Sequence, residues 1–478
     1  MSSADLWSIT PELWLIGLGV VLLLVDLVVP PSKKFVVGLI GVVGVLLSIL
    51  PAVGLFQSEP RTVLYGSYAV DGFAIFFKVL VAVATALVML ASIAYFNARV
   101  RFEGEFYALL VFTAVGLVLM AGSTDLILLA LAIEFVSLTS YVLAGYLKTS
   151  PKSNEAGIKY FLFGAAASAI MLFGFSLLYG LSGTTNFAEL AIKLRTAPPS
   201  ALYLGVAMML AGFGFKISMV PFHQWTPDVY EGAPTPVAAF LSVASKAAGF
   251  AALVRILLVA IDPARVDWVL LLAVLAAVSM TIGNLMALPQ RNIKRMLAYS
   301  SIAQAGFILI GAAAFRGNFG IPGLLIYLFG YTFTQLGAFF VVVLIGRQLG
   351  TDAIGDYAGL AQRAPVSAFL MTVFLLSLTG IPPTAVFFGK YYLLLAAIDN
   401  QLLWLAIIAV INSVISFYYY AGVIKAMYFL PATSTTPIEE PPSLQVALGI
   451  TGLGTLIIGL YPQPLIDLAR SAGLLLGL

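Results

Sequence analysis

The chain is dominated by long, uninterrupted apolar runs, and each run is about as long as the roughly 20 apolar residues that a helix needs to cross a bilayer. It is 61% hydrophobic and 9% charged, whereas soluble domains carry about 25% charged residues. The polar surface of a soluble protein therefore cannot be built from it. Because the runs are continuous rather than alternating ten-residue strands, a membrane β-barrel is excluded. The sequence predicts an all-α polytopic membrane protein.

Fourteen windows are suitable as spanning helices. They lie near residues 12–30, 35–55, 71–96, 105–122, 124–147, 155–181, 200–222, 235–260, 266–288, 292–314, 318–346, 365–396, 401–429 and 443–461. The first is not a signal peptide, because its early charges, Asp5 and Glu12, are acidic and a signal peptide begins with basic residues. Residues 186–198 mix charged and apolar positions at helical spacing and predict a surface helix. The stretch 464–478 is too short to span and is expected at the membrane interface.

Lysine and arginine are distributed unequally between alternate loops, and this bias predicts the orientation. The larger set has eleven members: Lys33, Lys34, Arg99, Arg101, Lys148, Lys152, Arg291, Lys294, Arg295, Arg347 and Arg363. The smaller set has six: Arg61, Lys193, Arg195, Arg265, Arg316 and Arg470. Basic residues accumulate in cytoplasmic loops, so both termini are expected on the outer side.

Several classes of chemistry are excluded by composition. The chain has no cysteine, which removes disulfides and cysteine-ligated iron–sulfur clusters. A single histidine, His223, makes a bis-histidine haem or a zinc site improbable. Neither a dinucleotide fingerprint nor a phosphate-binding Walker A sequence is present. We therefore expect no cofactor or metal site in this chain, and its small net charge of +3 does not indicate a nucleic-acid partner.

Five ionisable residues fall inside the predicted spans: Glu134, Lys159, Lys216, Lys246 and Lys390. A charged side chain at a helix centre costs about 3 kcal/mol on insertion scales. Without compensation, five would cost about as much as the whole stability of many domains, roughly 5–15 kcal/mol. These residues must therefore be paired or hydrated, and as a set they are the candidate functional residues.

Helix geometry suggests which of them meet. Glu134 and Lys159 flank a turn near residue 148 at similar distances, so their depths differ by only roughly 5 Å and contact between adjacent helices is expected to be possible. An inert structural ion pair between them is the alternative to a role in proton relay. Lys216 and Lys246 flank one loop in the same way. Two like charges at one depth repel each other, so one of them can release its proton more readily.

Other charges have plainer interpretations. Lys78 and Arg255 lie nearer the ends of their spans and are expected to extend to the headgroups. Asp228 and Glu231 follow the seventh span and are interpreted as solvated loop charges.

Prolines accompany two of the buried lysines. Pro221 follows Lys216, and Pro382 and Pro383 precede Lys390. Proline removes a helix hydrogen bond, and freed carbonyls at membrane depth are tolerated only where they are buried in protein or line a cavity. A broken helix beside a buried charge is typical of ion translocation. His223 is either part of a proton relay or an interface residue.

Three stretches carry a family resemblance. They are "GFGFKISMVPFHQWTPDVYEGAPTPVAAFLSVASKAAGF" (212–250), "LPQRNIKRMLAYSSIAQAGF" (288–307) and "TGIPPTAVFFGKYYL" (379–393). They resemble the antiporter-like membrane subunits of respiratory complex I, NADH–quinone oxidoreductase. Within that family, the lysine at 246 makes this chain similar to the N-subunit group, because the larger L and M subunits and the antiporter proteins typically lack a lysine there. Some relatives carry glutamate where this chain has Lys390.

The resemblance implies fourteen helices with two inverted five-helix repeats, in which helices 7 and 12 are broken. Residues 1–100 would form three N-terminal helices, 105–260 the first repeat and 266–429 the second. Residues 430–478 would form a C-terminal helix and an interfacial tail.

The resemblance also implies roles for the buried residues. Lys216 would be the central protonatable group, and Glu134 would tune its proton affinity. Lys246, helped by Ser242 and Ser245, would pass the proton inward, while Lys390 would gate the path to the outside. Lys159 belongs to the same relay.

The implied function is proton translocation coupled to electron transfer in other subunits, which would hold NADH, FMN, iron–sulfur clusters and quinone. K- and M-type subunits would be neighbours in a bacterial plasma membrane. Three alternatives remain: a subunit of a multisubunit Na⁺/H⁺ antiporter, a subunit of a ferredoxin- or F₄₂₀-linked relative of complex I, and a structural spacer with an inert charge network.

Overall fold

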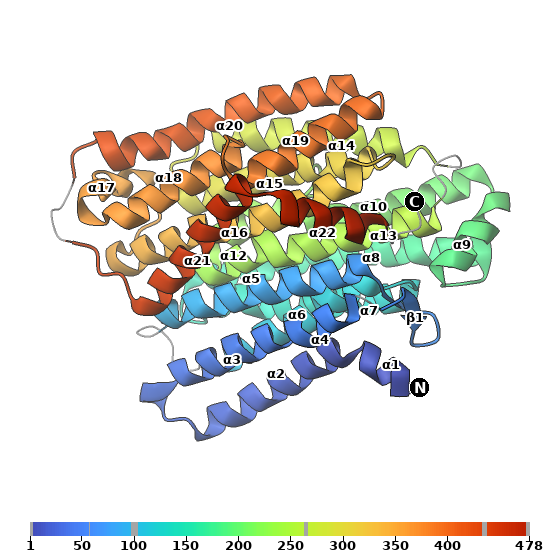
Figure 1. The fold of residues 1–478 in the computed structure, drawn as a ribbon, viewed down its shortest axis with the longest axis horizontal. Helices are drawn as coiled ribbons and strands as arrows, with labels where there is room; N and C mark the ends of the chain where they lie inside the picture. The colour runs from blue at the N-terminus through green and yellow to red at the C-terminus, as the bar shows by residue number, and fades with distance from the viewer. Residues whose placement is uncertain (1–2, 57, 97–103, 262–265, 433–436, 475–478) are drawn as a thin grey trace.

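The computed structural model describes residues 3–56, 58–96, 104–261, 266–432 and 437–474. Most helices run side by side along the longest axis of the molecule (Figure 1). Within the described residues, thirteen helices are long and apolar enough to cross a membrane by length and composition. This confirms the predicted all-α membrane fold.

The N-terminal part consists of paired helices and a short hairpin. Its elements are α1 (Ser3–Ser8), α2 (Thr10–Val28), η1 (Pro31–Lys33), α3 (Phe35–Leu47), α4 (Ile49–Phe56), β1 (Arg61–Val63), β2 (Tyr68–Val70) and α5 (Gly72–Phe96). The two strands are antiparallel, with Thr62 opposite Ala69. The hairpin leads directly into α5, whose residues are almost all buried.

Two groups of helices follow. The first comprises α6 (Gly104–Gly122), α7 (Leu126–Ala144), α8 (Pro151–Ser182), α9 (Phe187–Lys193), η2 (Leu194–Thr196), α10 (Pro199–Ile217), α11 (Trp225–Gly232), α12 (Thr235–Phe240), the π-helical turn η3 (Leu241–Ser245) and α13 (Lys246–Ala260). The second comprises α14 (Trp268–Ala287), α15 (Ile293–Ala313), α16 (Gly320–Leu349), η4 (Ile354–Tyr357), α17 (Leu360–Arg363), α18 (Pro365–Thr379), α19 (Ala385–Asp399) and α20 (Leu403–Phe429). The chain ends with α21 (Pro442–Leu460) and α22 (Gln463–Leu474).

The two groups share local features in inverted orientation. Asp125 caps the start of α7 and forms a β-bridge with Asn186, while Asn292 caps the start of α15 and forms a β-bridge with Ala353. The first bridge lies next to α9 and the second lies close to α17 in the chain. These two helices are at opposite ends of the bundle (Figure 1). An odd number of crossings per group produces this inversion.

Helices 7 and 12 are broken, as predicted. Helix α10 ends at Ile217 and α11 starts only at Trp225; α18 and α19 have 15 residues each and are separated by residues 380–384. The two breaks share two backbone features. A residue with positive φ (Ser218, 63°; Gly380, 91°) is followed by a cis peptide bond before Pro221 or Pro383.

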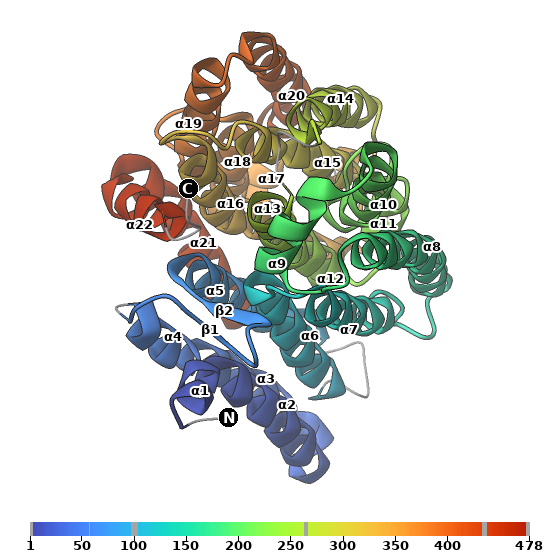
Figure 2. The ribbon, with the colours of Figure 1, turned by 90° about the vertical axis from the view of Figure 1, so that its right-hand side faces the viewer.

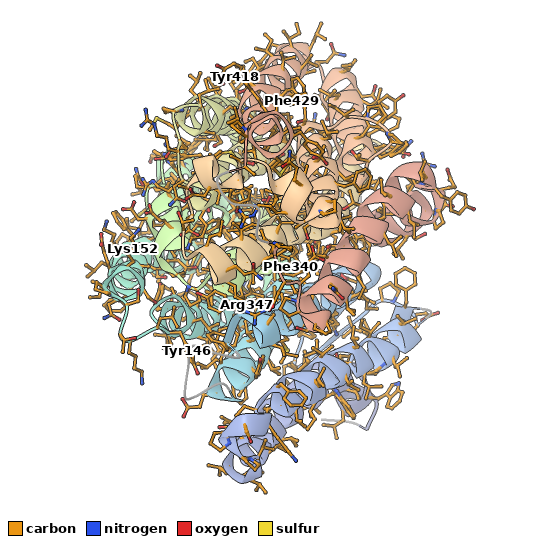
Figure 3. All side chains as sticks on the ribbon, turned by 90° about the vertical axis from the view of Figure 1, so that its left-hand side faces the viewer. Tyr146, Lys152, Phe340, Arg347, Tyr418 and Phe429 are labelled. Atoms are coloured by element: carbon orange, nitrogen blue, oxygen red, sulfur yellow. The ribbon has the colours of Figure 1, made fainter. Side chains whose placement is uncertain are left out.

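Burial separates the central helices from the peripheral ones. The most apolar windows of residues 235–260 and of α15 are 100% buried, whereas those of α2, α8 and α20 are 33% buried. The end-on view shows α2, α8 and α20 at the periphery (Figure 2). Tyr418 and Phe429 project outward from α20, while Phe340 of α16 lies inside (Figure 3). The outer helices therefore present apolar side chains to lipid, and the central helices are shielded from it.

Candidate functional site

Lys216 lies in the last turn of α10, just before the break, and its side chain is buried. Its Nζ donates a hydrogen bond to Ser137 Oγ on α7 at 3.3 Å. Glu134 lies one turn earlier on α7, on the same side of that helix as Ser137. Its Oε1 is buried and has no hydrogen-bond partner among the described residues. The structure therefore places Glu134 and Lys216 together, although no direct ion pair joins them in the described residues.

Lys246 is the first residue of α13 and follows the π-helical turn. Its buried Nζ donates to the backbone oxygen of Ser301 at 2.7 Å and to Ser301 Oγ at 2.5 Å. One turn later, a Cβ at Gly249 would lie 3.3 Å from Cγ of Lys216. Helix α13 therefore packs directly against the Lys216 side chain, while the ammonium groups of the two lysines have separate partners, Ser137 and Ser301.

The two serines expected to assist Lys246 have other contacts. Ser242 Oγ donates to the backbone oxygen of Ala239 at 2.8 Å, and Ser245 Oγ is buried without a hydrogen-bond partner among the described residues. The hydroxyl that binds Lys246 comes from Ser301 on α15, which the sequence did not single out.

Lys390 lies on α19, and its side chain reaches across the break in helix 12 to the last turn of α18. Its Nζ donates to the backbone oxygens of Leu378 (3.1 Å) and Thr379 (2.8 Å) and to Ser413 Oγ (3.2 Å). The carbonyls of a last helical turn have no partner within the helix, and a cation is favoured there by the helix dipole. A groove of about 380 Å³ opens beside Lys390 and is lined by Thr379 and Ser413.

Polar residues of α15 lie beside both the Lys246 region and the Lys390 region. The Gln304 side chain accepts a hydrogen bond from Tyr327 and donates to the backbone oxygen of Leu378 at 3.0 Å and to the Tyr420 hydroxyl at 3.4 Å. Leu378 O also accepts the bond from Lys390. Since α15 carries the Lys246 partner as well, one helix joins both lysines. Polar residues at positions 300, 301 and 304 of an apolar helix are a sequence signal that could have indicated these contacts.

The predicted contact between Lys159 and Glu134 is wrong. Lys159 forms ion pairs with Asp228 Oδ2 (2.7 Å) and Glu155 Oε1 (2.6 Å), and its side chain is 37% exposed. Helix α8 begins at Pro151 and has 32 residues, so it extends beyond its apolar window. Lys159 is therefore only about two turns from the helix start, rather than deep in the bundle.

The interpretation of Asp228 and Glu231 as solvated loop charges is also wrong. Asp228 Oδ1 and Glu231 Oε2 both accept hydrogen bonds from Arg295 Nη1, at 2.7 and 3.0 Å, and Lys152 pairs with Glu231 at 3.2 Å. Burial raises the pKa of Asp228, but its bonds to Lys159 and Arg295 outweigh this and hold the pKa below its usual value. This ionic cluster joins α8 and α11 to α15, and therefore joins the two helix groups.

His223 lies in the connection between α10 and α11 and is half-buried. Its Nδ1 is buried without a hydrogen-bond partner among the described residues. Burial lowers the pKa of His223, opposed by a hydrogen bond with the Pro221 backbone. No described hydrogen bond connects His223 with Lys216, so their proximity in sequence does not become a direct contact.

Lys78 and Arg255 do not extend to the headgroups, contrary to the prediction. Lys78 Nζ pairs with Glu12 Oε1 at 2.7 Å, with both side chains buried. Arg255 forms two hydrogen bonds with the Asp71 carboxylate, at 2.7 and 2.8 Å. The first helix and the hairpin bring these carboxylates into the interior, and single apolar windows do not reveal this.

Comparisons with known proteins agree with this architecture. The family described as "NADH:quinone oxidoreductase/Mrp antiporter, TM" matches residues 123–416. NADH-quinone oxidoreductase subunit N of Trichlorobacter lovleyi is 45% identical over 474 residues, covering 97% of this chain and 96% of that protein. The protein of the same name from Moorella thermoacetica is 45% identical over 472 residues, covering 98% of both.

Among solved structures, a chain of respiratory complex I from Thermus thermophilus with bound aureothin superposes with a TM-score of 0.82 at 33% identity. The match covers 96% of this chain and 100% of that one. With 45% identity over nearly their full lengths, the chain belongs to the NADH-quinone oxidoreductase subunit N family.

Proposed function

We propose that this chain is a proton-translocating, antiporter-like subunit of an NADH–quinone oxidoreductase, driven by electron transfer in other subunits. One observation carries the proposal. Three buried ammonium groups, on Lys216, Lys246 and Lys390, are held by hydroxyl and carbonyl oxygens rather than by carboxylates. Such a lysine can gain or lose its proton without breaking an ion pair, whereas the ion-paired Lys78 cannot.

In the proposed relay, Lys216 is the central protonatable residue and Glu134 tunes its proton affinity. Lys246 passes the proton to the second helix group through the α15 network, and Lys390 controls release beside the groove at the second break. Moving one charge across 100 mV costs about 2.3 kcal/mol. In the proposed relay, electrostatic changes at the buried lysines that follow electron transfer in the other subunits supply this energy.

Lys159 and His223 are proposed to take part in proton uptake. Lys159 binds Asp228 on α11, and His223 lies in the connection that precedes this helix. Both are more exposed than the three central lysines, so water can reach them. The alternative for each is a structural role at this end of the bundle.

We further propose that residues 105–260 and 266–429 are the two inverted repeats, preceded by three helices in 1–100 and followed by a C-terminal helix and interfacial tail in 430–478. The bundle would lie in a bacterial plasma membrane with both termini outside. Two residues of the larger basic set, Lys152 and Arg347, are visible at the same end of the bundle (Figure 3). That end is proposed to face the cytoplasm.

The remaining proposals concern the complex. NADH, FMN, iron–sulfur clusters and quinone are expected to bind to other subunits, and K- and M-type membrane subunits are expected neighbours. Purification of the tagged chain in mild detergent tests this directly. Co-eluting NADH–quinone reductase activity supports complex I. A cofactor-free assembly of membrane subunits supports the Na⁺/H⁺ antiporter, and activity with another donor supports the ferredoxin- or F₄₂₀-linked relative.

The relay is tested by the number of protons pumped per NADH oxidised in proteoliposomes that contain the complex. Lys216→Met is expected to lower this ratio. Lys425→Met is the matched control, because Lys425 lies on the exposed face of the spanning helix α20. An unchanged ratio in the Lys216 variant, with normal electron transfer, would refute the central role and favour the inert structural spacer.

A further inference from the structure

A cavity of about 610 Å³ opens where α15 ends and α16 begins. Its walls include Pro322 from the start of α16, Arg316, Asn318 and Phe319 from the preceding connection, and Arg470 from α22. The volume lies within the range of small-molecule sites, roughly 300–1,000 Å³. None of the residues proposed for the relay lines this cavity.

The two arginines approach the cavity from segments that are far apart in the sequence. Arg470 Nη2 donates to the Tyr392 hydroxyl at 3.1 Å, which fixes the guanidinium group. Within the described part of the chain, neither arginine forms an ion pair with a carboxylate, and no acidic side chain lines the cavity. Asp467, on the same helix as Arg470, instead accepts a hydrogen bond from Gln463 at 2.8 Å. The cavity therefore carries two positive charges without a protein counter-charge.

The position of the cavity suits a lipid headgroup. It lies at the end of two spanning helices, and α22 beside it is amphipathic. Ile466 and Ala469 are buried, whereas Asp467 and Ser471 are exposed. The end-on view shows α22 on the side of the bundle, next to α16 and α21 (Figure 2). An amphipathic helix of this kind lies where hydrocarbon meets the headgroups.

The distribution of basic residues also favours a lipid headgroup as the ligand. Arg316 and Arg470 both belong to the smaller basic set, which has six members in the whole chain. Two of the few basic residues on that face thus converge on one cavity. Arginine binds phosphate oxygens through its planar fork of N–H groups, and an anionic phospholipid headgroup presents such oxygens.

We propose that this cavity binds one anionic phospholipid. The guanidinium groups of Arg316 and Arg470 bind its phosphate, and the Asn318 amide is available to a further headgroup oxygen. The apolar faces of Phe319 and Pro322 contact the glycerol and the first acyl carbons. The lipid fills the space between α22 and the start of α16, and so fastens the C-terminal helix to the bundle.

The test uses the intact complex in nanodiscs that contain phosphatidylglycerol and phosphatidylcholine. Cryo-electron microscopy locates the lipid, and mass spectrometry of extracts from the detergent-washed complex counts the phosphatidylglycerol that is retained. The double variant Arg316→Gln/Arg470→Gln is compared with Lys193→Gln/Arg195→Gln, which removes two charges from a surface segment in the same basic set. Arg316→Lys/Arg470→Lys keeps the charge, so lipid retention in it separates loss of binding from misfolding.

We expect lipid density in the cavity of the wild-type complex. Of the two Gln double variants, only Arg316→Gln/Arg470→Gln is expected to lose one retained phosphatidylglycerol per complex. A second arm adds inorganic phosphate to the wild type. If phosphate alone occupies the cavity, the ligand is a free anion and the lipid proposal is overturned. Equal retention in both Gln pairs, or a neighbouring subunit's side chain in the cavity, overturns it as well.

Discussion

A buried ion pair between Arg255 and Asp71 makes a sharp test of how the N-terminal helices are attached. Arg255 donates to both Asp71 carboxylate oxygens, at 2.7 and 2.8 Å, and its Nε donates to the backbone oxygen of Ala121 at 2.8 Å. Both charged side chains are more than nine-tenths buried. One arginine of α13 thus holds the end of α6 and the residue that precedes α5.

Arg255→Leu leaves the Asp71 carboxylate buried without a partner. Removing one member of a buried pair costs about 3–5 kcal/mol. Asp71 Oδ1 keeps the hydrogen bond from the Ala74 backbone N–H at 2.7 Å, so we expect a loss near the lower end of that range. Replacing both members removes the unpaired charge, so Asp71→Leu/Arg255→Leu should lose clearly less stability than Arg255→Leu alone.

Tryptophan fluorescence during thermal unfolding of the detergent-solubilised complex measures these losses, and the exposed Arg195→Leu is the control. If Arg255→Leu were destabilised no more than that control, about 0.5 kcal/mol or less, the pair would not hold these helices together. The pH dependence is a second check. Burial raises the pKa of Asp71, but Arg255 outweighs this and holds the pKa below its ordinary value. The contribution of Asp71 is therefore complete above the ordinary aspartate pKa of about 4 and is lost as the pH falls through the lowered value.

Two further substitutions probe the second break and the ionic cluster. Gly380→Ala is expected to lower the unfolding temperature and proton pumping, because φ is +91° and the new Cβ would lie 2.7 Å from Lys390 Cδ. Gly355→Ala, which has open space around the Cβ, is the control, and equal effects of the two would contradict the reasoning. Asp228→Asn should cost only about 1 kcal/mol or less, because its pairs with Lys159 and Arg295 are both partly exposed. A thermal-shift series should find this loss at neutral pH and find it shrinking as the pH falls below about 4; a loss independent of pH would exclude the ion pair as its cause.

The broken helices were predictable because proline acts locally. Pro221 and Pro383 interrupt the helix wherever the rest of the chain lies, so the positions of both breaks follow from the sequence. The burial of Lys216, Lys246 and Lys390 was equally predictable, because long apolar stretches flank each of them. These are properties of single segments, and single segments can be read from a sequence.

Pairing between segments was not predictable in the same way. Counting residues from a turn gives the depth of Lys159 and Glu134, but it does not say toward which neighbour each side chain points. Lys159 lies on the face of α8 that meets α11, where Asp228 accepts its hydrogen bond. The break in helix 7 is what allows α11 to present Asp228 there. The partner of Lys246, Ser301, belongs to the other helix group and is equally invisible to an argument from depth.

The order of lysine and proline differs between the two breaks in sequence, but the structure gives this difference a simple meaning. Lys216 precedes its break and lies in the last turn of α10. Lys390 follows its break, yet its ammonium group reaches back to the carbonyls of Leu378 and Thr379 in the last turn of α18. Both lysines therefore lie beside the C-terminal end of a first half-helix, but only Lys390 binds its carbonyls, where the helix dipole favours a cation by about 0.3–1 kcal/mol; Lys216 instead binds Ser137 of α7. A pair of broken helices can thus place a buried lysine beside each break although the sequence puts the two lysines on opposite sides of the prolines.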